Sequence, residues 1–294
     1  MLFDLNIPWT PTTSLSSLEK ILSFQSELGY NTIALSYTQS DKSLPSKLTN
    51  PIPIDLPFNI PSKTVVLRRC TLTLSDPAHN HRLSSLASLY DILAIRPTNE
   101  KAFLAACLQT SEHSIISLDL TTRYPFHFKP KILMTAINRG IMIEICYSQC
   151  ITADTTGRRN FISNLLSVTR CTKGRGLIIS SEASNVMACR GVADITNLLG
   201  VWGLSRERAV EGFSLHPRGV VVNEKLKRSG YRGIINVIDG GPSDPSSKSK
   251  EKRGIETDRA ESSSSLSKRA AKRAKMREQH EKLTSMGAGD TLLP

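Results

Sequence analysis

Short apolar runs rich in β-branched residues alternate with helical patterns through the first 240 residues of the chain. Most of these runs are continuously apolar, as expected for parallel strands that are covered on both faces. Eight runs are predicted to be strands: Leu2–Asn6, Thr32–Tyr37, Thr64–Leu74, Ile92–Arg96, Ile115–Leu120, Ile141–Tyr147, Leu177–Ser181 and Gly219–Val222. The repeated order of strand and helix predicts an α/β fold built on a parallel sheet.

Helical patterns fill most of the intervals between the runs. The predicted helices are Ser14–Leu28, Arg82–Tyr90, Asn99–Thr110, Pro130–Arg139, Arg159–Thr172, Asn185–Leu199 and Ser205–Gly212. Eight strands and seven helices in this length match a TIM-like (β/α)8 barrel, whose usual size is about 250 residues. The alternative is a doubly wound open sheet, which usually has fewer strands and often carries a GxGxxG motif that is missing after the first run here.

The composition changes at Gly240. Gly240-Gly241-Pro242 is followed by sequence rich in Ser, Lys and Glu, including four consecutive serines from Ser262 to Ser265. Such a segment cannot bury enough apolar surface to offset the entropy lost on ordering. We therefore predict two parts: a barrel domain over residues 1–240 and a disordered basic tail over residues 241–294.

The chain is strongly basic, with a formal net charge of +12 and a pI near 9.6. Residues 1–150 hold 13 basic and 11 acidic side chains, a net +2, whereas residues 151–240 hold 13 and 7, a net +6. Residues 241–294 hold 12 and 8, a net +4. This balance favours a polyanionic partner, either nucleic acid or an anionic membrane surface. A generally basic, solvated surface is the plainer alternative.

The six cysteines are Cys70, Cys107, Cys146, Cys150, Cys171 and Cys189. None of them forms a CxxC pair, and several lie in apolar stretches where a free thiol behaves as a small core residue. This usage indicates a reducing compartment. The sequence shows neither a basic-then-apolar leader nor an apolar run of membrane-spanning length, so we expect a cytosolic or nuclear protein without membrane contact.

Polar residues near the ends of the predicted strands are the candidates for chemistry, because a parallel barrel carries its function at the C-terminal ends of its strands. They are Asn6, Arg96, Asp119, Glu144 and Glu182. Histidine is missing from this set, and no GxSxG, P-loop or HExxH motif occurs. Asp119 and Glu144 form a possible carboxylate pair, but without a histidine or nucleophile the signal is weak.

One histidine pair, His79 and His81, has a spacing that could bind a metal. It lies just before a predicted helix with no third ligand nearby, so a surface loop is the favoured interpretation. We therefore predict no catalytic residue, no metal site and no cofactor.

Basic residues form the second group of candidate functional residues. The cations Arg123, Lys129 and Lys131 surround the aromatic string Tyr124–Phe128, and Arg158 and Arg159 open a predicted helix. Such cations neutralise phosphates, and aromatic rings among them can stack on bases. The alternatives are a core position for the rings and a solvated helix face for each single arginine. Together the residues favour an RNA-binding surface.

A further basic run lies in the predicted tail. Lys268, Arg269, Lys272, Arg273 and Lys275 resemble a nuclear localisation signal, in which acidic receptor grooves bind an extended cationic segment. A solvated charged helix or a second RNA-contacting arm is the alternative.

Strings spread along the chain resemble the thirty-kilodalton protein subunit family of ribonuclease P and ribonuclease MRP. They occur in order between residue 2 and about residue 223, and none of them is a catalytic motif. The strings are Phe3–Pro8, Leu28–Leu35, Leu93–Glu100, Pro125–Lys129, Ile137–Gly140, Glu144–Ser148, Ile178–Ala183, Arg190–Asp194 and Asn197–Gly200. The tail after residue 240 carries no part of the resemblance.

The resemblance implies a TIM-like barrel that acts as an RNA-binding subunit and not as an enzyme. In that family the RNA subunit removes the 5′ leader of precursor tRNA with bound metal ions, and the sister complex processes rRNA precursors. The implied partners are the catalytic RNA, precursor tRNA and other protein subunits, especially a small subunit that pairs with the barrel. The implied location is the nucleus, and within it the nucleolus. The residues expected to face RNA, including Arg158 from the cation cluster, are Arg123, Lys131, Arg139, Arg158, Arg159, Lys173 and Arg190.

The family also resembles the polymerase-and-histidinol-phosphatase barrels, which are metal-dependent phosphoesterases. Their first strand carries a DLHxH-like string whose histidines bind metal, and here Asn6 and Pro8 stand at those two positions. Proline cannot ligate a metal through its side chain, so this departure favours a scaffold. A free-standing phosphoesterase is the rival hypothesis, and an RNA-binding protein outside ribonuclease P is a third.

Overall fold

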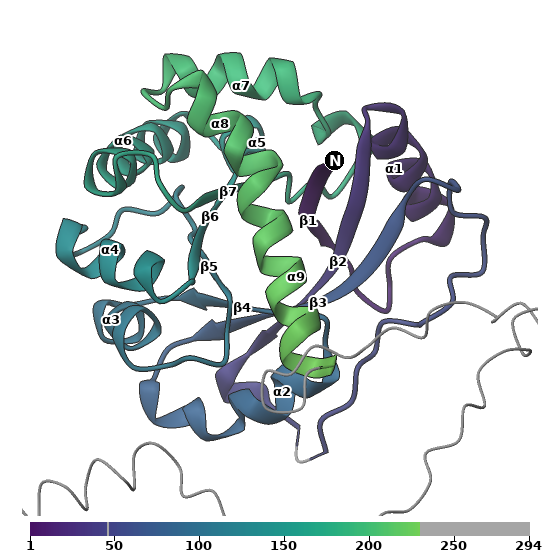
Figure 1. Cartoon of the computed structure of the whole chain (residues 1–294), viewed down its shortest axis with the longest axis horizontal. Helices are drawn as coiled ribbons and strands as arrows, with labels where there is room; N and C mark the ends of the chain where they lie inside the picture. Colours follow the sequence, from purple (N-terminus) through teal and green to yellow (C-terminus); the bar gives the residue numbers. More distant parts are fainter. Residues whose placement is uncertain (46, 230–294) are drawn as a thin grey trace, which may run out of the picture. The chain divides into compact units, whose positions relative to one another are not determined.

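A computed structural model of the protein describes residues 1–45 and 47–229 and places seven parallel strands in one sheet. The strands follow one another in chain order around a barrel (Figure 1). Their bounds are β1 Leu2–Pro8, β2 Tyr30–Ser40, β3 Val65–Leu74, β4 Ile92–Pro97, β5 Ile115–Ser117, β6 Met142–Cys146 and β7 Leu177–Ser180. The TIM-like barrel predicted from the alternation is confirmed.

The ladders are in parallel register throughout. The longest joins β2 to β3, from Thr32 opposite Val65 to Ser40 opposite Thr73. The first and last strands approach each other without a ladder among the described residues. Instead, the backbone N–H of Glu182, just after β7, donates to the carbonyl of Asn6 in β1 at 2.8 Å. The barrel is therefore nearly closed.

Helices surround the strands (Figure 1). The α-helices are α1 Leu15–Glu27, α2 Leu83–Leu89, α3 Glu100–Leu108, α4 Pro130–Asn138, α5 Ser148–Thr152, α6 Thr155–Thr172, α7 Val192–Val201, α8 Arg206–Phe213 and α9 Leu215–Ser229. Three short 3-10 helices are η1 Asp41–Ser43, η2 Pro77–Arg82 and η3 Val186–Ala188. Within the described residues, no helix combines the length and the apolar character needed to cross a bilayer.

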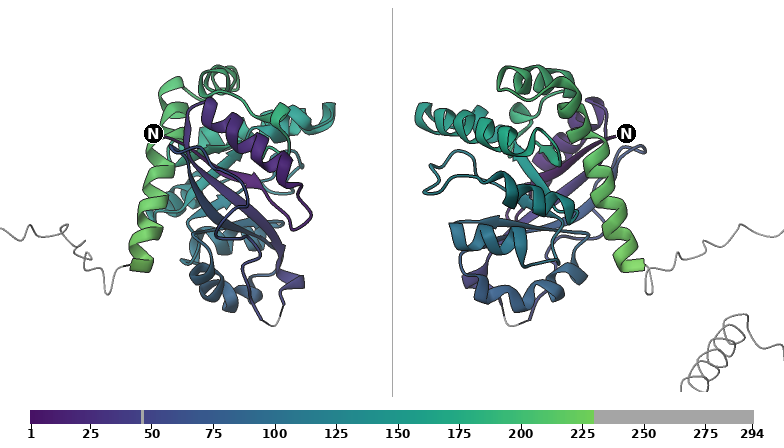
Figure 2. Two further views of the ribbon diagram at one scale, coloured as in Figure 1. Left: turned by 90° about the vertical axis from the view of Figure 1, so that its right-hand side faces the viewer. Right: turned by 60° about the vertical axis from the view of Figure 1, so that its left-hand side comes forward.

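The predicted eighth strand is wrong: Gly219–Val222 lies inside α9. Figure 1 shows α9, in green, running across the strands, and both views of Figure 2 show it along one side of the barrel. Val220 of α9 is buried in one cluster with residues near the N-terminal ends of the strands, among them Phe3, Ile92 and Ile178. The three successive valines favour a strand locally, but this packing stabilises a helix that covers the N-terminal opening of the barrel.

One predicted helix is also different. The segment Asn185–Leu199 contains η3 and most of α7, separated by an extended backbone at Cys189. The amide oxygen of Asn185 accepts from the N–H of Ala188 at 3.0 Å and so caps η3. This early cap, with Gly191 at the start of α7, interrupts the pattern that predicted a single helix.

The hydrophobic core lies mainly between the strands and their surrounding helices. All six cysteines are free, and five of them are buried, as predicted for small core residues. The predicted boundary at residue 240, the tail over residues 241–294 and its basic run lie outside the described residues.

Candidate functional site

The barrel interior contains a fully buried ion pair. Arg69 lies in β3 and Glu144 in β6, and both side chains are 0% exposed. The guanidinium donates to the two carboxylate oxygens at 2.5 and 2.6 Å, a bidentate arrangement. It also donates to the carbonyl of Leu5 at 2.7 Å and to the hydroxyl of Thr71 at 3.0 Å. One cation therefore links β1, β3 and β6 across the barrel.

Burial alone would disfavour the charge on each member of this pair. For Glu144, the neighbouring guanidinium outweighs burial and lowers the pKa of the carboxyl below its usual value. The carboxylate correspondingly raises the pKa of Arg69. Glu144 also accepts from the hydroxyl of Ser180 at 2.8 Å and from the amide of Asn6 at 3.4 Å. Its oxygens are thus fully engaged in holding the strands together.

A second buried carboxylate, Asp4, is held by neutral hydrogen-bond donors. It accepts from the backbone N–H of Ser181 at 3.0 Å, from that of Asn6 at 3.3 Å, and from the amide of Gln25 at 2.8 Å. Burial raises the pKa of Asp4 to about 6, although the hydrogen bonds from Ser181 and Asn6 lower it. Folding therefore favours the protonated form of Asp4, because burying the charge costs more than these hydrogen bonds return.

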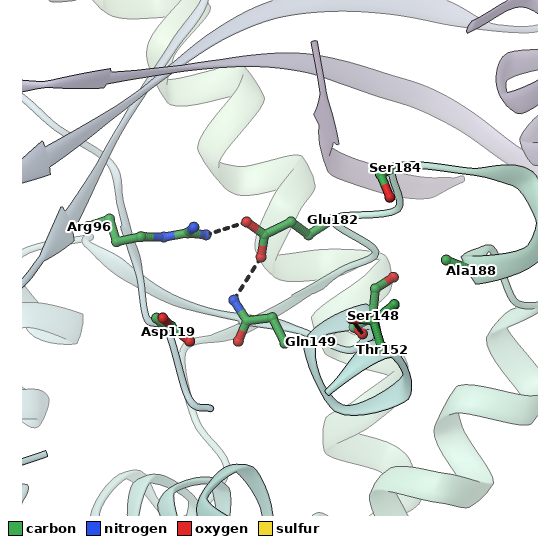
Figure 3. A pocket seen from close by; sticks show the side chains of 8 residues that line it. All are labelled: Arg96, Asp119, Ser148, Gln149, Thr152, Glu182, Ser184 and Ala188. Atoms are coloured by element: carbon green, nitrogen blue, oxygen red, sulfur yellow. Dashed lines mark hydrogen bonds and ion pairs between the residues drawn. The ribbon is translucent and has the colours of Figure 1, made fainter. Parts of the chain in front are cut away.

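A pocket of about 250 Å³ opens at the C-terminal ends of the strands, the mouth of the barrel (Figure 3). Arg96, at the end of β4, donates to Glu182 at 2.7 Å and to Ser117 at 3.0 Å. Gln149 of α5 donates to the other Glu182 oxygen at 2.7 Å. Asp119 also lines the pocket. These contacts hold Glu182 in a left-handed conformation with φ of 55°, which is costly for a residue with a Cβ.

The five strand-end candidates thus divide between two places. Arg96, Asp119 and Glu182 line the mouth pocket, whereas Asn6 and Glu144 lie inside the barrel. The possible pairing of Asp119 with Glu144 is wrong, because Glu144 is bound by Arg69 and Asp119 accepts from Thr121 at 2.6 Å.

Sequence reasoning missed Arg69. Its signal was an arginine in the middle of a strand with apolar residues on either side, because a charge buried there requires a counter-charge.

The positions that bind metal in the phosphoesterase barrels have other roles in this chain. Among the described residues, no group of three or more His, Cys, Asp or Glu side chains could hold a metal ion. Asn6, at one of the two histidine positions, donates its amide to Glu144 and to the sulfur of Cys146. Pro8 ends β1, and His79 and His81 fall within η2. Asn6 therefore contributes to the buried network that holds Glu144.

The predicted RNA-facing residues lie at both ends of the barrel. A helix that follows a strand runs back along it, so the segment after each strand and the start of the next helix lie at the mouth. Five residues occupy such segments: Arg123, Lys131, Arg158, Arg159 and Arg190. Arg139 and Lys173 follow the C-terminal ends of α4 and α6 and lie at the opposite end. The structure therefore does not bring these two together with the other five.

Three of these arginines bind backbone carbonyls. Arg139 donates to Cys107 and Thr110 at the end of α3, at 2.7 and 2.6 Å. Arg158 donates to the carbonyls of Cys150 and Ile151, both at 3.1 Å. Arg190 donates to Met187 and to its neighbour Cys189 at 2.6 and 2.8 Å. These contacts give each of the three a structural role that the sequence did not indicate.

The fold and this site define a class: a TIM-like barrel whose interior and mouth are held by ion pairs and whose mouth is flanked by exposed cations. The chain belongs to the RNase P subunit p30 family, whose model matches residues 1–229.

Relatives agree with this assignment over most of their length. The Probable ribonuclease P protein subunit 3 of Schizosaccharomyces pombe is 36% identical, over 80% of this chain and 99% of the relative. The mouse Ribonuclease P protein subunit p30 is 31% identical, over 77% of this chain and 87% of the relative.

A solved structure resembles the fold. It is a chain in the cryo-EM structure of archaeal ribonuclease P with mature tRNA, with a TM-score of 0.61 at 13% identity, and the match covers 82% of this chain and all of that one. At this identity the likeness concerns the fold alone.

Proposed function

We propose that this chain is an RNA-binding protein subunit of ribonuclease P, and of ribonuclease MRP, and that the RNA subunit performs the cleavage. The observation that carries the proposal is the family match over residues 1–229, together with relatives named as ribonuclease P subunits. Its partners would be the catalytic RNA, precursor tRNA and other protein subunits, including a small one paired with the barrel. The complex would act in the nucleus, and within it the nucleolus.

The chemistry of the barrel supports a scaffold over the rival phosphoesterase. Hydrolysis of a phosphodiester by a metal site requires carboxylates or histidines that are free to ligate. Glu144 is bound by Arg69 inside the barrel, and Glu182 is bound by Arg96 and Gln149 at the mouth. Both acids therefore stabilise the positions of strands and loops.

The RNA-facing surface would be the mouth side of the barrel. Arg123, Lys131 and Arg159 are exposed there and offer positive charge to phosphates. Arg158 and Arg190 combine a structural contact with a partly free charge. In the tail, Lys268, Arg269, Lys272, Arg273 and Lys275 remain the candidate import signal.

The test of the proposal is affinity purification of the full chain from its own cells, followed by sequencing of the RNA that co-purifies. We expect the ribonuclease P and MRP RNAs to be enriched together with precursor tRNA cleavage activity. That activity should disappear when the RNA is digested, and recombinant protein free of RNA should not cleave. Cleavage by the RNA-free protein that depends on metal would support the phosphoesterase instead.

A narrower prediction concerns the two arginines at the start of α6. Replacing both Arg158 and Arg159 with alanine should weaken RNA binding and reduce the slope of log K against log salt by roughly 0.7–0.9 for each phosphate that is no longer neutralised. Fluorescence anisotropy across a salt series measures the slope, and Lys20→Ala on the exposed face of α1 is the control. An unchanged slope in a folded double variant would mean that these residues face away from RNA.

A further inference from the structure

A groove of about 530 Å³ lies between α6 and the loop that connects β5 to α4. It is separate from the mouth pocket and shares no lining residue with it. Asn164 of α6 donates its amide to the carbonyls of Leu120 and Thr122, both at 2.8 Å, and Asn160 donates to that of Thr121 at 3.0 Å. These bonds hold the loop against the helix, so the groove is preformed.

One wall of the groove is aromatic. Phe128 is only 8% exposed and packs on Phe103 of α3, with ring centroids 5.6 Å apart. Phe126 packs on Phe103, Tyr124 and Phe128 at 5.3 to 5.7 Å but is only partly buried, and so is Tyr124. His127 also lines the groove and is an exposed residue. The core thus fixes the base of this wall, while partly exposed π-systems line the groove.

The opposite wall is polar along one stripe of α6. Asn160, Ser163, Asn164, Ser167 and Arg170 follow the spacing of one helix face. The stripe extends for about 15 Å at the helical rise of 1.5 Å per residue. Because the amide nitrogens of Asn160 and Asn164 already bind the loop, their oxygens are directed elsewhere and have no partner among the described residues. They can accept hydrogen bonds from a ligand.

The groove is cationic. Arg123 lines it from the loop and Arg170 from α6, and neither guanidinium forms an ion pair with a described residue. No described lining residue is acidic. Aromatic faces beside unpaired cations fit a ligand that has flat bases on a phosphate backbone. A paired helix would instead present its bases stacked and inaccessible.

We propose that this groove, between α6 and the loop containing Tyr124–Phe128, binds unpaired nucleotides of RNA. Phosphates meet Arg123 and Arg170, a base stacks on the Phe126 and His127 side, and the amide oxygens of Asn160 and Asn164 accept from base edges. The proposal rests on the proposed RNA-binding function and assigns to it a site and a ligand class. It also gives the post-β5 loop a binding site distinct from the mouth pocket, with which it shares no lining residue.

The test uses the full-length protein and two probes: a short single-stranded oligouridylate and a fully paired RNA duplex of the same length. The wild-type chain should prefer the single strand. Ser163→Trp fills the groove without changing the charge and should weaken single-strand binding about tenfold, comparable to losing one stacked base, with little effect on the duplex. Phe126→Leu keeps an apolar side chain but removes the π-face, and should act in the same direction.

Two double variants that each remove two positive charges distinguish binding in the groove from nonspecific electrostatic attraction. Arg123→Ala with Arg170→Ala should weaken single-strand binding and lower its salt slope by about 0.7 for each phosphate left without its cation. Lys20→Ala with Lys63→Ala removes two exposed cations outside the groove and should leave the single-strand preference unchanged. Equal losses of affinity in the two double variants, or an unaltered affinity in folded Ser163→Trp, would overturn the proposal.

The outcomes also distinguish this site from the wider function. If the wild-type chain co-purifies no ribonuclease P RNA but shows the groove-dependent preference, the proposed function fails and the site stands. If the RNA co-purifies equally with Ser163→Trp and oligouridylate affinity is unaltered, the site fails and the function stands. Loss of a protein partner from Ser163→Trp without loss of single-strand affinity would make the groove a protein-binding site.

Discussion

Replacing Arg69 with methionine is expected to lower the free energy of unfolding by about 3–5 kcal/mol, because it leaves the buried carboxylate of Glu144 without a counter-charge. Chemical denaturation of the recombinant protein measures the change. Arg68→Met is the matched control: Arg68 is the preceding residue, its side chain is 28% exposed, and its contact with Asp91 is 3.7 Å long. The control should change stability by less than about 1 kcal/mol.

The double variant Arg69→Met with Glu144→Leu removes both charges of the buried pair. Comparing it with Arg69→Met shows how much of the instability comes from leaving the Glu144 carboxylate unpaired. With both charges removed, most of the stability should return, since apolar side chains of similar size often replace a buried ion pair without net loss. A double variant as unstable as Arg69→Met alone would contradict this account. It would indicate that the bonds to Leu5 and Thr71, and not the charge, stabilise the barrel.

Replacing Asp4 with asparagine is expected to stabilise the protein at pH 7 by up to about 3 kcal/mol. The folded pKa of about 6 exceeds the unfolded value near 3.8, so folding favours the protonated acid. The contribution of Asp4 is therefore complete below about pH 4 and is lost as the pH rises to about 6. The new amide can donate to the Gln25 oxygen, which is buried without a partner, once the Gln25 amide rotates.

Denaturation curves of both proteins between pH 4 and pH 8 test this expectation. His113 changes the stability with pH in the opposite direction. Burial lowers its pKa to about 3, so its contribution to the free energy of unfolding is lost as the pH falls below about 6.5. The informative quantity is therefore the difference between variant and wild type, which should grow from pH 4 to pH 6 and then stay constant. A difference that does not change with pH would contradict the assignment.

Sequence patterns predicted the first seven strands because each strand is covered by other parts of the protein on both faces and is therefore a nearly continuous apolar run. They failed at Gly219–Val222, where local preference favours a strand and the packing of Val220 into the barrel opening stabilises a helix. That packing depends on residues far apart in the chain, such as Phe3 and Ile178. No local pattern could have indicated it.

For a similar reason, the sequence predicted only part of the candidate site. Residue types near strand ends indicated which polar groups would gather, and Arg96 and Glu182 do meet at the mouth. The sequence could not indicate that Glu144 faces inward toward Arg69, because that depends on the register of distant strands. Nor could it separate Arg159 from Arg139: both are exposed, but the guanidinium of Arg139 donates to the carbonyls of Cys107 and Thr110 at the end of α3. Such contacts depend on how the helices pack in the assembled barrel.

The position of α9 has a consequence for how the protein is made. Val220 covers apolar side chains of strands that leave the ribosome much earlier, and Arg228 donates to the carbonyls of Tyr90 and Asp91 at the start of β4. The nascent chain therefore cannot complete its barrel until residues near 229 have emerged from the exit tunnel. Until then the strand ends stay open to water and to chaperones, so synthesis itself sets the earliest moment at which the subunit can join a partner.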